Sequence, residues 1–210
     1  MNTIIPAILV HDEASFRGRL AQVDGLAPEI QIDVMDGKFV PNKTWCDLKA
    51  LAHIQTTSAF ELHLMVEDPE PWIHAAVDVP SVKRLVWHVE GMGDHRELVE
   101  LCQDYEKEAG LAISPKTPFD ILRPYVLGLS EILILGVEPG FSGQGLLPGT
   151  IDKARSIHAE WPAIPLAWDG GVTPKTLPLI RDAGVTRFCA ASAIFDAPDP
   201  AVALEALKRL

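Results

Sequence analysis

The sequence predicts a (β/α)8 barrel, a closed ring of parallel strands surrounded by helices. Eight segments with strand character alternate with helix-like segments along the 210 residues, without an evident linker or low-complexity stretch. Such alternation is typical of parallel α/β folds, and the length suits a compact barrel. We therefore expect residues 1–210 to form one domain. A doubly wound sheet is the alternative, but it normally brings a glycine-rich turn after the first strand, where this sequence has none.

The predicted elements follow from the period of their apolar residues and from the turn residues between them. Strands are expected over residues 3–10, 30–35, 60–65, 84–88, 110–114, 131–137, 164–169 and 187–190. Helices are expected over residues 12–23, 45–55, 68–77, 94–108, 120–126, 150–160, 174–183 and 199–207. Asp12 is a suitable N-cap for the first helix, and proline lies in the first turn of the third.

Composition and charge exclude several classes of protein. The chain is 48% apolar and 22% charged, which is ordinary for a globular protein, and no apolar run is long enough to span a membrane. Residues 1–5 lack the basic region of a signal peptide, and three cysteines without CxxC spacing are typical of a reducing compartment, so we expect a cytoplasmic protein. The net charge of −11 argues against nucleic acid as a partner. An anionic small molecule stays compatible, because backbone N–H groups can bind it.

Polar side chains occupy one face of the second predicted strand. Ile30, Ile32 and Val34 alternate with Gln31, Asp33 and Met35. The branched apolar face is expected to pack outward on helices, which turns the polar face into the barrel. A buried carboxylate is costly unless it is paired, so Asp33 needs a cation, a hydrogen-bond donor or a catalytic reason.

The same parity applies to two other strands. His63 and Met65 should point inward on the third strand, and Asp169 on the seventh. In this fold functional groups lie at the C-terminal ends of strands, so Asp33, His63 and Asp169 are expected to meet at one mouth. A satisfied buried polar cluster is the alternative, but three such groups at matching depths favour a functional site. His88 alone is expected to be a hydrogen-bonded wall residue, and the five remaining histidines to be solvated.

Small residues follow the last three strands. They form the glycine-rich loop 140–145, the pair Gly170-Gly171 and the pair Ala191-Ser192. The loops after strands seven and eight are the usual phosphate site of this fold, where backbone N–H groups surround an anion. Each pair alone would be compatible with a tight turn. Together they predict a phosphate site closed by the loop 140–145.

Five motifs in this sequence resemble the ribulose-phosphate 3-epimerase (pentulose-phosphate 3-epimerase) family. They are DVMDGKFVPN at residues 33–42, HLMV at 63–66, PGFSGQ at 139–144, DGG at 169–171 and SAIF at 192–195. The resemblance runs through nearly the whole chain. It implies an isomerase that epimerises a ketose phosphate, similar to ribulose 5-phosphate, at carbon 3.

The resemblance also implies roles for individual residues. Asp33 and Asp169 would be the acid–base pair, and with His63 they would hold a divalent metal (Mn, Mg, Fe or Zn). Gln31 takes the place of the fourth metal ligand, a histidine in the family. Residues implied to bind substrate or phosphate are Met35, His63, Met65, Gly140, Phe141, Ser142, Gly143, Gly170, Gly171, Ala191 and Ser192.

Several positions depart from the family pattern. Ala7, Gln31 and Leu135 replace a serine, a histidine and a methionine, and Ser114, Glu138 and Ala191 differ as well. A carboxamide oxygen is a poor ligand for Zn²⁺ and a better one for harder ions, so we expect weak metal binding that favours Mn²⁺ or Mg²⁺. Lys116 is a candidate replacement cation, although a solvated loop lysine is the simpler interpretation.

These departures keep two alternatives open beside the epimerase. The first is a non-catalytic homologue that binds sugar phosphates. The second is an enzyme with another sugar-phosphate isomerase or lyase reaction. All three interpretations share a phosphorylated ketose as ligand, and none fixes the oligomeric state, so a homo-oligomer stays open.

Overall fold

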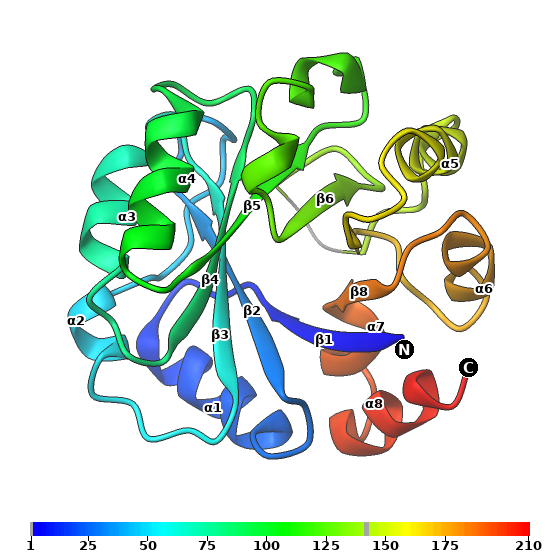
Figure 1. Ribbon diagram of the computed structural model, residues 1–210. Coiled ribbons are helices and arrows are strands. Elements are labelled where there is room, and N and C mark those ends of the chain that lie inside the picture. The colour runs from blue at the N-terminus through cyan, green and yellow to red at the C-terminus, as the bar shows by residue number, and fades with distance from the viewer. Residues whose placement is uncertain (1, 141–142) are drawn as a thin grey trace.

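The eight strands form one closed parallel barrel, as the sequence predicts. The computed structural model describes residues 2–140 and 143–210. Neighbouring strands in the chain are neighbours in the barrel, and β1 also pairs with β8, which closes the ring (Figure 1). The strands are β1 Thr3–Ile8, β2 Glu29–Met35, β3 Ala59–Met65, β4 Val82–His88, β5 Glu108–Ile113, β6 Glu131–Leu135, β7 Leu166–Asp169 and β8 Arg187–Ala190.

Helices surround the barrel and connect its strands (Figure 1). They are α1 Glu13–Val23, α2 Leu48–Leu51, α3 Glu70–Ala76, α4 His95–Asp104, α5 Thr150–Glu160, α6 Leu177–Arg181, α7 Ser192–Phe195 and α8 Pro200–Lys208. Asp12 caps α1 as predicted, because its carboxylate accepts a hydrogen bond from the N–H of Ser15. The two ends of the chain lie on the same side of the molecule, next to β1 and α8.

The connection between β5 and β6 differs from the prediction. The helix expected over residues 120–126 is replaced by two short 3-10 helices, η1 Phe119–Leu122 and η2 Val126–Gly128. Pro124 lies between them, and a proline lacks the N–H that a continuous helix would need there. The predicted helix 94–108 is also too long. The observed helix α4 ends at Asp104, and Glu106 adopts a left-handed φ of 56° before β5 begins at Glu108.

Apolar side chains form a large core outside the barrel and a smaller one inside it. Ile30, Ile32 and Val34 on β2 belong to the large outer core between the barrel and the helices. The smaller inner core fills the middle of the barrel and comprises Ile5, Ala7, Val86, Ala112, Leu133, Leu135, Ala167 and Cys189. The predicted parity of β2 is therefore confirmed, and the polar residues of that strand lie inside the barrel.

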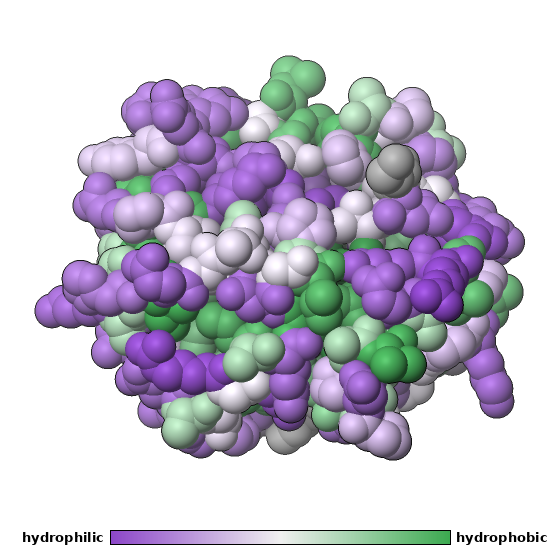
Figure 2. Space-filling view, turned by 90° about the horizontal axis from the view of Figure 1, so that it is seen from below, coloured by the Kyte–Doolittle hydropathy of each residue, from purple (hydrophilic) through white to green (hydrophobic). Residues whose placement is uncertain are grey.

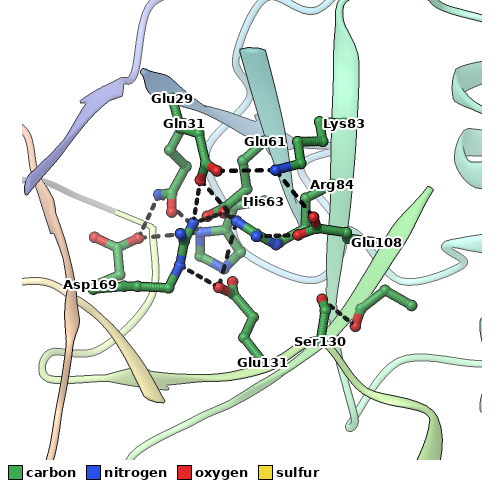
Figure 3. Close-up of polar contacts among 12 residues, drawn as sticks. Glu29, Gln31, Glu61, His63, Lys83, Arg84, Glu108, Ser130, Glu131 and Asp169 are labelled. Carbon is green, nitrogen blue, oxygen red and sulfur yellow. Dashed lines mark hydrogen bonds and ion pairs between the residues drawn. The ribbon is translucent and has the colours of Figure 1, made fainter. Parts of the chain in front are cut away.

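An ionic network, which we call the barrel floor, fills the N-terminal end of the barrel interior. It comprises Glu29, Glu61, Lys83, Arg84, Glu108, Glu131 and Arg187 (Figure 3). Glu61 Oε2 lies 2.7 Å from Arg84 Nη1 and 2.8 Å from Arg187 Nη2. Gly110 leaves room for this network, since a Cβ there would lie 3.0 Å from Glu131 Cγ. The inner apolar core separates the floor from the C-terminal end of the barrel.

Hydrophobic and hydrophilic residues alternate on the outer surface. Figure 2 shows a face on which hydrophobic residues form a broken band between hydrophilic ones. Among the described residues, no helix has the length and apolar character needed to cross a membrane.

Candidate functional site

Asp33, His63 and Asp169 lie together at the C-terminal end of the barrel. Strand register places Asp33 beside His63 on the neighbouring strands β2 and β3. Asp169 is the last residue of β7, on the other side of β1 and β8. His63 Nδ1 lies 3.1 Å from Asp33 Oδ1 and 3.1 Å from Asp169 Oδ2, so one imidazole joins the two carboxylates.

Gln31 makes a second link between the same carboxylates. Its Nε2 donates to Asp33 Oδ1 at 2.8 Å. It also donates to Asp169 Oδ2 at 2.9 Å (Figure 3). The Gln31 side chain is fully buried, and its Oε1 has no hydrogen-bond partner within the described part of the chain. The amide therefore presents its donor end to the carboxylates and leaves its acceptor end unused.

Burial and mutual charge set the ionisation of this group. Burial, together with the nearby charge of Asp169, raises the pKa of Asp33 above its ordinary value. Burial alone would lower the pKa of His63, but hydrogen bonds and charge from Asp169 and Asp33 raise it to about 10. His63 is therefore an imidazolium near neutral pH, and it partly balances the two acidic side chains.

A chain of hydrogen bonds continues from His63 to β4 and β5. His63 Nε2 lies 3.1 Å from His88 Nε2, and His88 Nδ1 lies 3.2 Å from Glu90 Oε2. Burial lowers the pKa of His88, so this ring is neutral and accepts from His63 while donating to Glu90. Glu90 Oε1 accepts in turn from the N–H of Ser114 at 2.9 Å. The orientation of His63 is thus fixed from both sides.

A cavity lies directly above the carboxylates. Asp33 and Asp169 line the base of this cavity, and Met35 and Met65 contribute to its apolar wall. The other lining residues come mainly from the loops after β6, β7 and β8, with Leu9 from the loop after β1, and they are Leu9, Leu135, Val137, Glu138, Pro139, Gly140, Gly143, Gln144, Gly170, Val172, Cys189, Ala191 and Ser192. The carboxylates therefore open into a cleft on the side of the barrel where phosphate is expected.

Glycine is required where β7 leads into this cavity. Gly170 has a φ of 95° and Gly171 a φ of 69°, both in the left-handed region. A Cβ on Gly170 would collide with Val137, and one on Gly171 would lie 2.6 Å from Leu146 Cδ2. The loop after β6 approaches from the other side, where Asn42 Nδ2 donates to the carbonyl of Gly140 at 3.1 Å. Positions 170 and 171 therefore both need glycine, because the Val137 and Leu146 side chains pack against the backbone of this turn.

Comparison with known proteins decides the family. The sequence matches the Ribulose-phosphate 3 epimerase family over residues 3–195. The chain belongs to this family. It is 30% identical to ribulose-phosphate 3-epimerase of Schizosaccharomyces pombe over 98% of this chain and 92% of that protein. It is 31% identical to ribulose-phosphate 3-epimerase of Mycobacterium tuberculosis over 98% of this chain and 91% of that protein. The predicted resemblance is confirmed, and the chain is an enzyme of the ribulose-phosphate 3-epimerase type.

Solved structures support the fold of this family member. KGPDC from Streptococcus mutans superposes with a TM-score of 0.77 over 100% of this chain and 96% of that one, at 12% identity. A 3-hexulose-6-phosphate synthase superposes with a TM-score of 0.70 over 100% of this chain and 99% of that one, at 16% identity. At such low identity these likenesses concern the barrel alone.

A divalent metal is typical of the epimerase family, and three residues here are suited to one. Asp33, His63 and Asp169 each offer a ligand atom, and these atoms lie within 4.8 Å of one another. Two carboxylates and an imidazole suit several divalent ions. Gln31 does not complete the set in its present orientation, because an amide N–H cannot bind a cation. The metal-binding role of all four residues stays a prediction.

The structure brings most of the expected site residues together. Asp33 and Asp169 line one cavity with Met35, Met65, Gly140, Gly143, Gly170, Ala191 and Ser192. His63 lies beneath it and is fully buried, and Gly171 stands next to it. Phe141 and Ser142 lie outside the described residues. Lys116 pairs with Glu138 at the surface and is 84% exposed, as the simpler interpretation predicts.

His88 is the hydrogen-bonded wall residue that the sequence predicts, whereas sequence reasoning missed Glu90. Glu90 lies two positions after His88, the last residue of β4, so the alternation of that strand could have placed it on the same inward side. The prediction that His95 is solvated is wrong. His95 is 5% exposed, and it accepts a hydrogen bond from Trp87 Nε1 at 3.1 Å.

Proposed function

We propose that this protein epimerises a ketose phosphate, similar to ribulose 5-phosphate, at carbon 3 by proton transfer between two aspartates. The observation that carries the proposal is the meeting of Asp33 and Asp169 in one cavity from strands on different sides of the barrel. Family membership supports the reaction class. The names of the relatives supply ribulose phosphate as the substrate.

Epimerisation needs a proton removed from one face of carbon 3 and another delivered to the opposite face. A carboxylate takes the proton next to the carbonyl, which leaves an enediolate, and the second carboxyl group returns a proton from the other side. A single rigid carboxylate reaches only one face. The raised pKa of Asp33 supports a pair in which one member holds a proton while the other is ionised.

The developing oxyanion needs positive charge nearby. The His63 imidazolium lies between the two aspartates and supplies part of it. A divalent metal held by Asp33, His63 and Asp169 would replace this charge by Lewis acidity, because a His63 ring that binds a metal is neutral. His88 and Glu90 orient the His63 ring in either case, because they hold its Nε2 side away from the carboxylates.

The phosphate group is proposed to bind beside Gly170, Gly171, Ala191 and Ser192, with the loop 140–145 as a lid. The left-handed φ of Gly170 and Gly171 supports this, since a turn of this kind can present backbone N–H groups to an anion. The two carboxylates line the same cavity as Gly170, Ala191 and Ser192, so a single sugar phosphate would contact both sets of residues.

The test is a product analysis of purified protein with ribulose 5-phosphate. Signals of the carbon-3 epimer should appear in the ¹³C spectrum, and Asp33→Asn and Asp169→Asn should each lower the rate at least 100-fold. Saturable binding without any product would instead support the binding homologue. A product other than the carbon-3 epimer would support a different isomerase or lyase reaction.

We also infer a cytoplasmic location. The three cysteines are all free thiols, and Cys102 and Cys189 are buried, which suits a reducing compartment. A rice relative, 28% identical over 98% of this chain, carries the name of a cytoplasmic isoform.

A further inference from the structure

We propose that Gln31 competes with a divalent metal for the two carboxylates instead of serving as its fourth ligand. The amide holds Asp33 and Asp169 together from within the site, so a cation has to displace its two N–H bonds before it can bind. From the proposed function this inference takes only the metal-binding role of Asp33, His63 and Asp169, and it does not depend on turnover.

The orientation of the amide is the first argument. Nε2 donates to Asp33 and Asp169 at 2.8 and 2.9 Å. Turning the amide over would face Oε1 toward two acidic groups, and the NH₂ group would then occupy the place where Oε1 has no partner among the described residues. Two buried donors would be unsatisfied there instead of one acceptor. Buried unpaired donors are costly, so the two carboxylates select the present orientation.

The shared carboxylate oxygens are the second argument. Asp33 Oδ1 and Asp169 Oδ2 each lie within 2.8–3.1 Å of both Gln31 Nε2 and His63 Nδ1. In Figure 3 a dashed line joins the Gln31 amide to the Asp169 carboxylate. A cation bound to these two oxygens would lie beside the Gln31 N–H groups, and an N–H donor cannot bind a cation. The two Gln31 hydrogen bonds must therefore break before a metal can bind there.

The two roles of Gln31 predict opposite effects of one substitution. Gln31→Leu keeps a similar volume but removes both the donor and the acceptor. If the amide competes with the metal, Mn²⁺ should bind the variant at least tenfold more tightly than wild type, about 1.4 kcal/mol. If the amide is a ligand, Mn²⁺ should bind the variant more weakly.

The experiment is a titration of metal-free protein with Mn²⁺, followed by calorimetry and by the electron paramagnetic resonance signal of free Mn²⁺. Gln103→Leu is the matched control, because Gln103 lies exposed on α4 and the same substitution there should leave Mn²⁺ affinity unchanged. Weaker, unchanged or undetectable Mn²⁺ binding by Gln31→Leu would overturn the proposal. Loss of epimerase activity would not bear on it.

If Gln31→Leu does not fold, the proposal can still be tested by NMR on the wild-type protein. The side-chain NH₂ signals of Gln31, resolved by ¹⁵N NMR, should be protected from hydrogen exchange in metal-free protein. Saturating Mg²⁺ should shift them and remove the protection, because the cation breaks both hydrogen bonds. Gln31 signals that stay protected with Mg²⁺ bound would also overturn the proposal.

Discussion

The environment of Asp33 combines one like charge with donors from two sides. Asp169 and burial favour the protonated carboxyl, whereas His63 and Gln31 favour the carboxylate through hydrogen bonds. Such opposition is typical of catalytic acids, whose proton must leave and return near neutral pH. The sequence could predict that Asp33 needs a partner, because a buried carboxylate has to be paired. It could not predict that an amide would supply part of that pairing.

Zinc affinity should rise when the missing imidazole is restored. Wild type purified without added metal should contain far less than one zinc per chain, because Gln31 supplies no ligand suited to Zn²⁺. Gln31→His should raise zinc affinity about tenfold or more, ~1.4 kcal/mol. Elemental analysis and a competitive chelator titration measure both values. A stoichiometric, tightly held zinc in wild type would contradict the prediction.

Glu131 on the barrel floor should make the free energy of unfolding depend on pH. Burial, reinforced by Glu61, raises its pKa to about 8 from an ordinary value of 4.5. Both of its carboxylate oxygens lack a hydrogen bond among the described residues, although Oε2 lies 2.5 Å from Arg187 Nε. The folded state keeps the proton between these pH values while the unfolded state loses it. Glu131 therefore costs stability increasingly as the pH rises from about 4.5 to 8.

Glu131→Gln should thus stabilise the protein relative to wild type at pH 8, and by less at pH 5. Glu29 is the matched control of opposite sign, since Arg187 and Arg84 outweigh its burial and lower its pKa to about 2. The Glu29 carboxylate therefore stabilises the folded state above about pH 4.5, and this stabilisation is lost as the pH falls toward 2. Glu29→Gln should lower the free energy of unfolding by about 1–3 kcal/mol at pH 7. Thermal unfolding across pH 3–9 measures the stability of both variants relative to wild type. Parallel pH profiles for the two variants would contradict this assignment.

Among the elements, strands were easier to predict than helix ends. The alternation on β2 fixes which side chains face inward, because a shift of one residue would expose the whole apolar face. Helix ends depend on details that periodicity does not contain. Asp47 caps α2 by accepting from two N–H groups, so that helix begins at Leu48 instead of residue 45. α7 spans only Ser192–Phe195 and has too few residues for a period to be recognised.

The turn after β7 should tolerate no side chain. Gly170→Ala would force a left-handed φ on alanine and push its Cβ into Val137, at a cost of roughly 2–4 kcal/mol in the free energy of unfolding. Gly18→Ala is the control. Gly18 lies within α1 with open space around it, so alanine there should stabilise by about 0.5–1 kcal/mol. Urea unfolding distinguishes the two, and equal effects would contradict the role assigned to Gly170.

The loops after β7 and β8 should bind phosphate through backbone groups. Inorganic phosphate should then compete with a sugar phosphate for one site, because both place a dianion beside Gly170 and Ser192. Calorimetric competition measures this, with the unphosphorylated sugar as the control. Equal affinity for the phosphorylated and unphosphorylated sugar would exclude the proposed phosphate site.

The whole molecule divides its interior between stability and chemistry. The floor at the N-terminal end of the strands is ionic, the middle is apolar, and the C-terminal end holds the acidic pair with His63. This division is typical of the fold, in which the C-terminal face carries function. The sequence predicts the barrel because eight strand segments recur along it. It does not predict the floor, since partners such as Glu29 and Arg187 are 158 positions apart.

Proton exchange at carbon 3 in D₂O tests the central claim that Asp33 and Asp169 serve opposite faces of one substrate. Wild type, Asp33→Asn and Asp169→Asn are each incubated with ribulose 5-phosphate, and carbon 3 is followed by NMR. We predict that wild type exchanges the proton and epimerises, whereas Asp169→Asn loses epimerisation but keeps exchange on the face that Asp33 serves. Wild-type rates of epimerisation in both single variants would contradict the account.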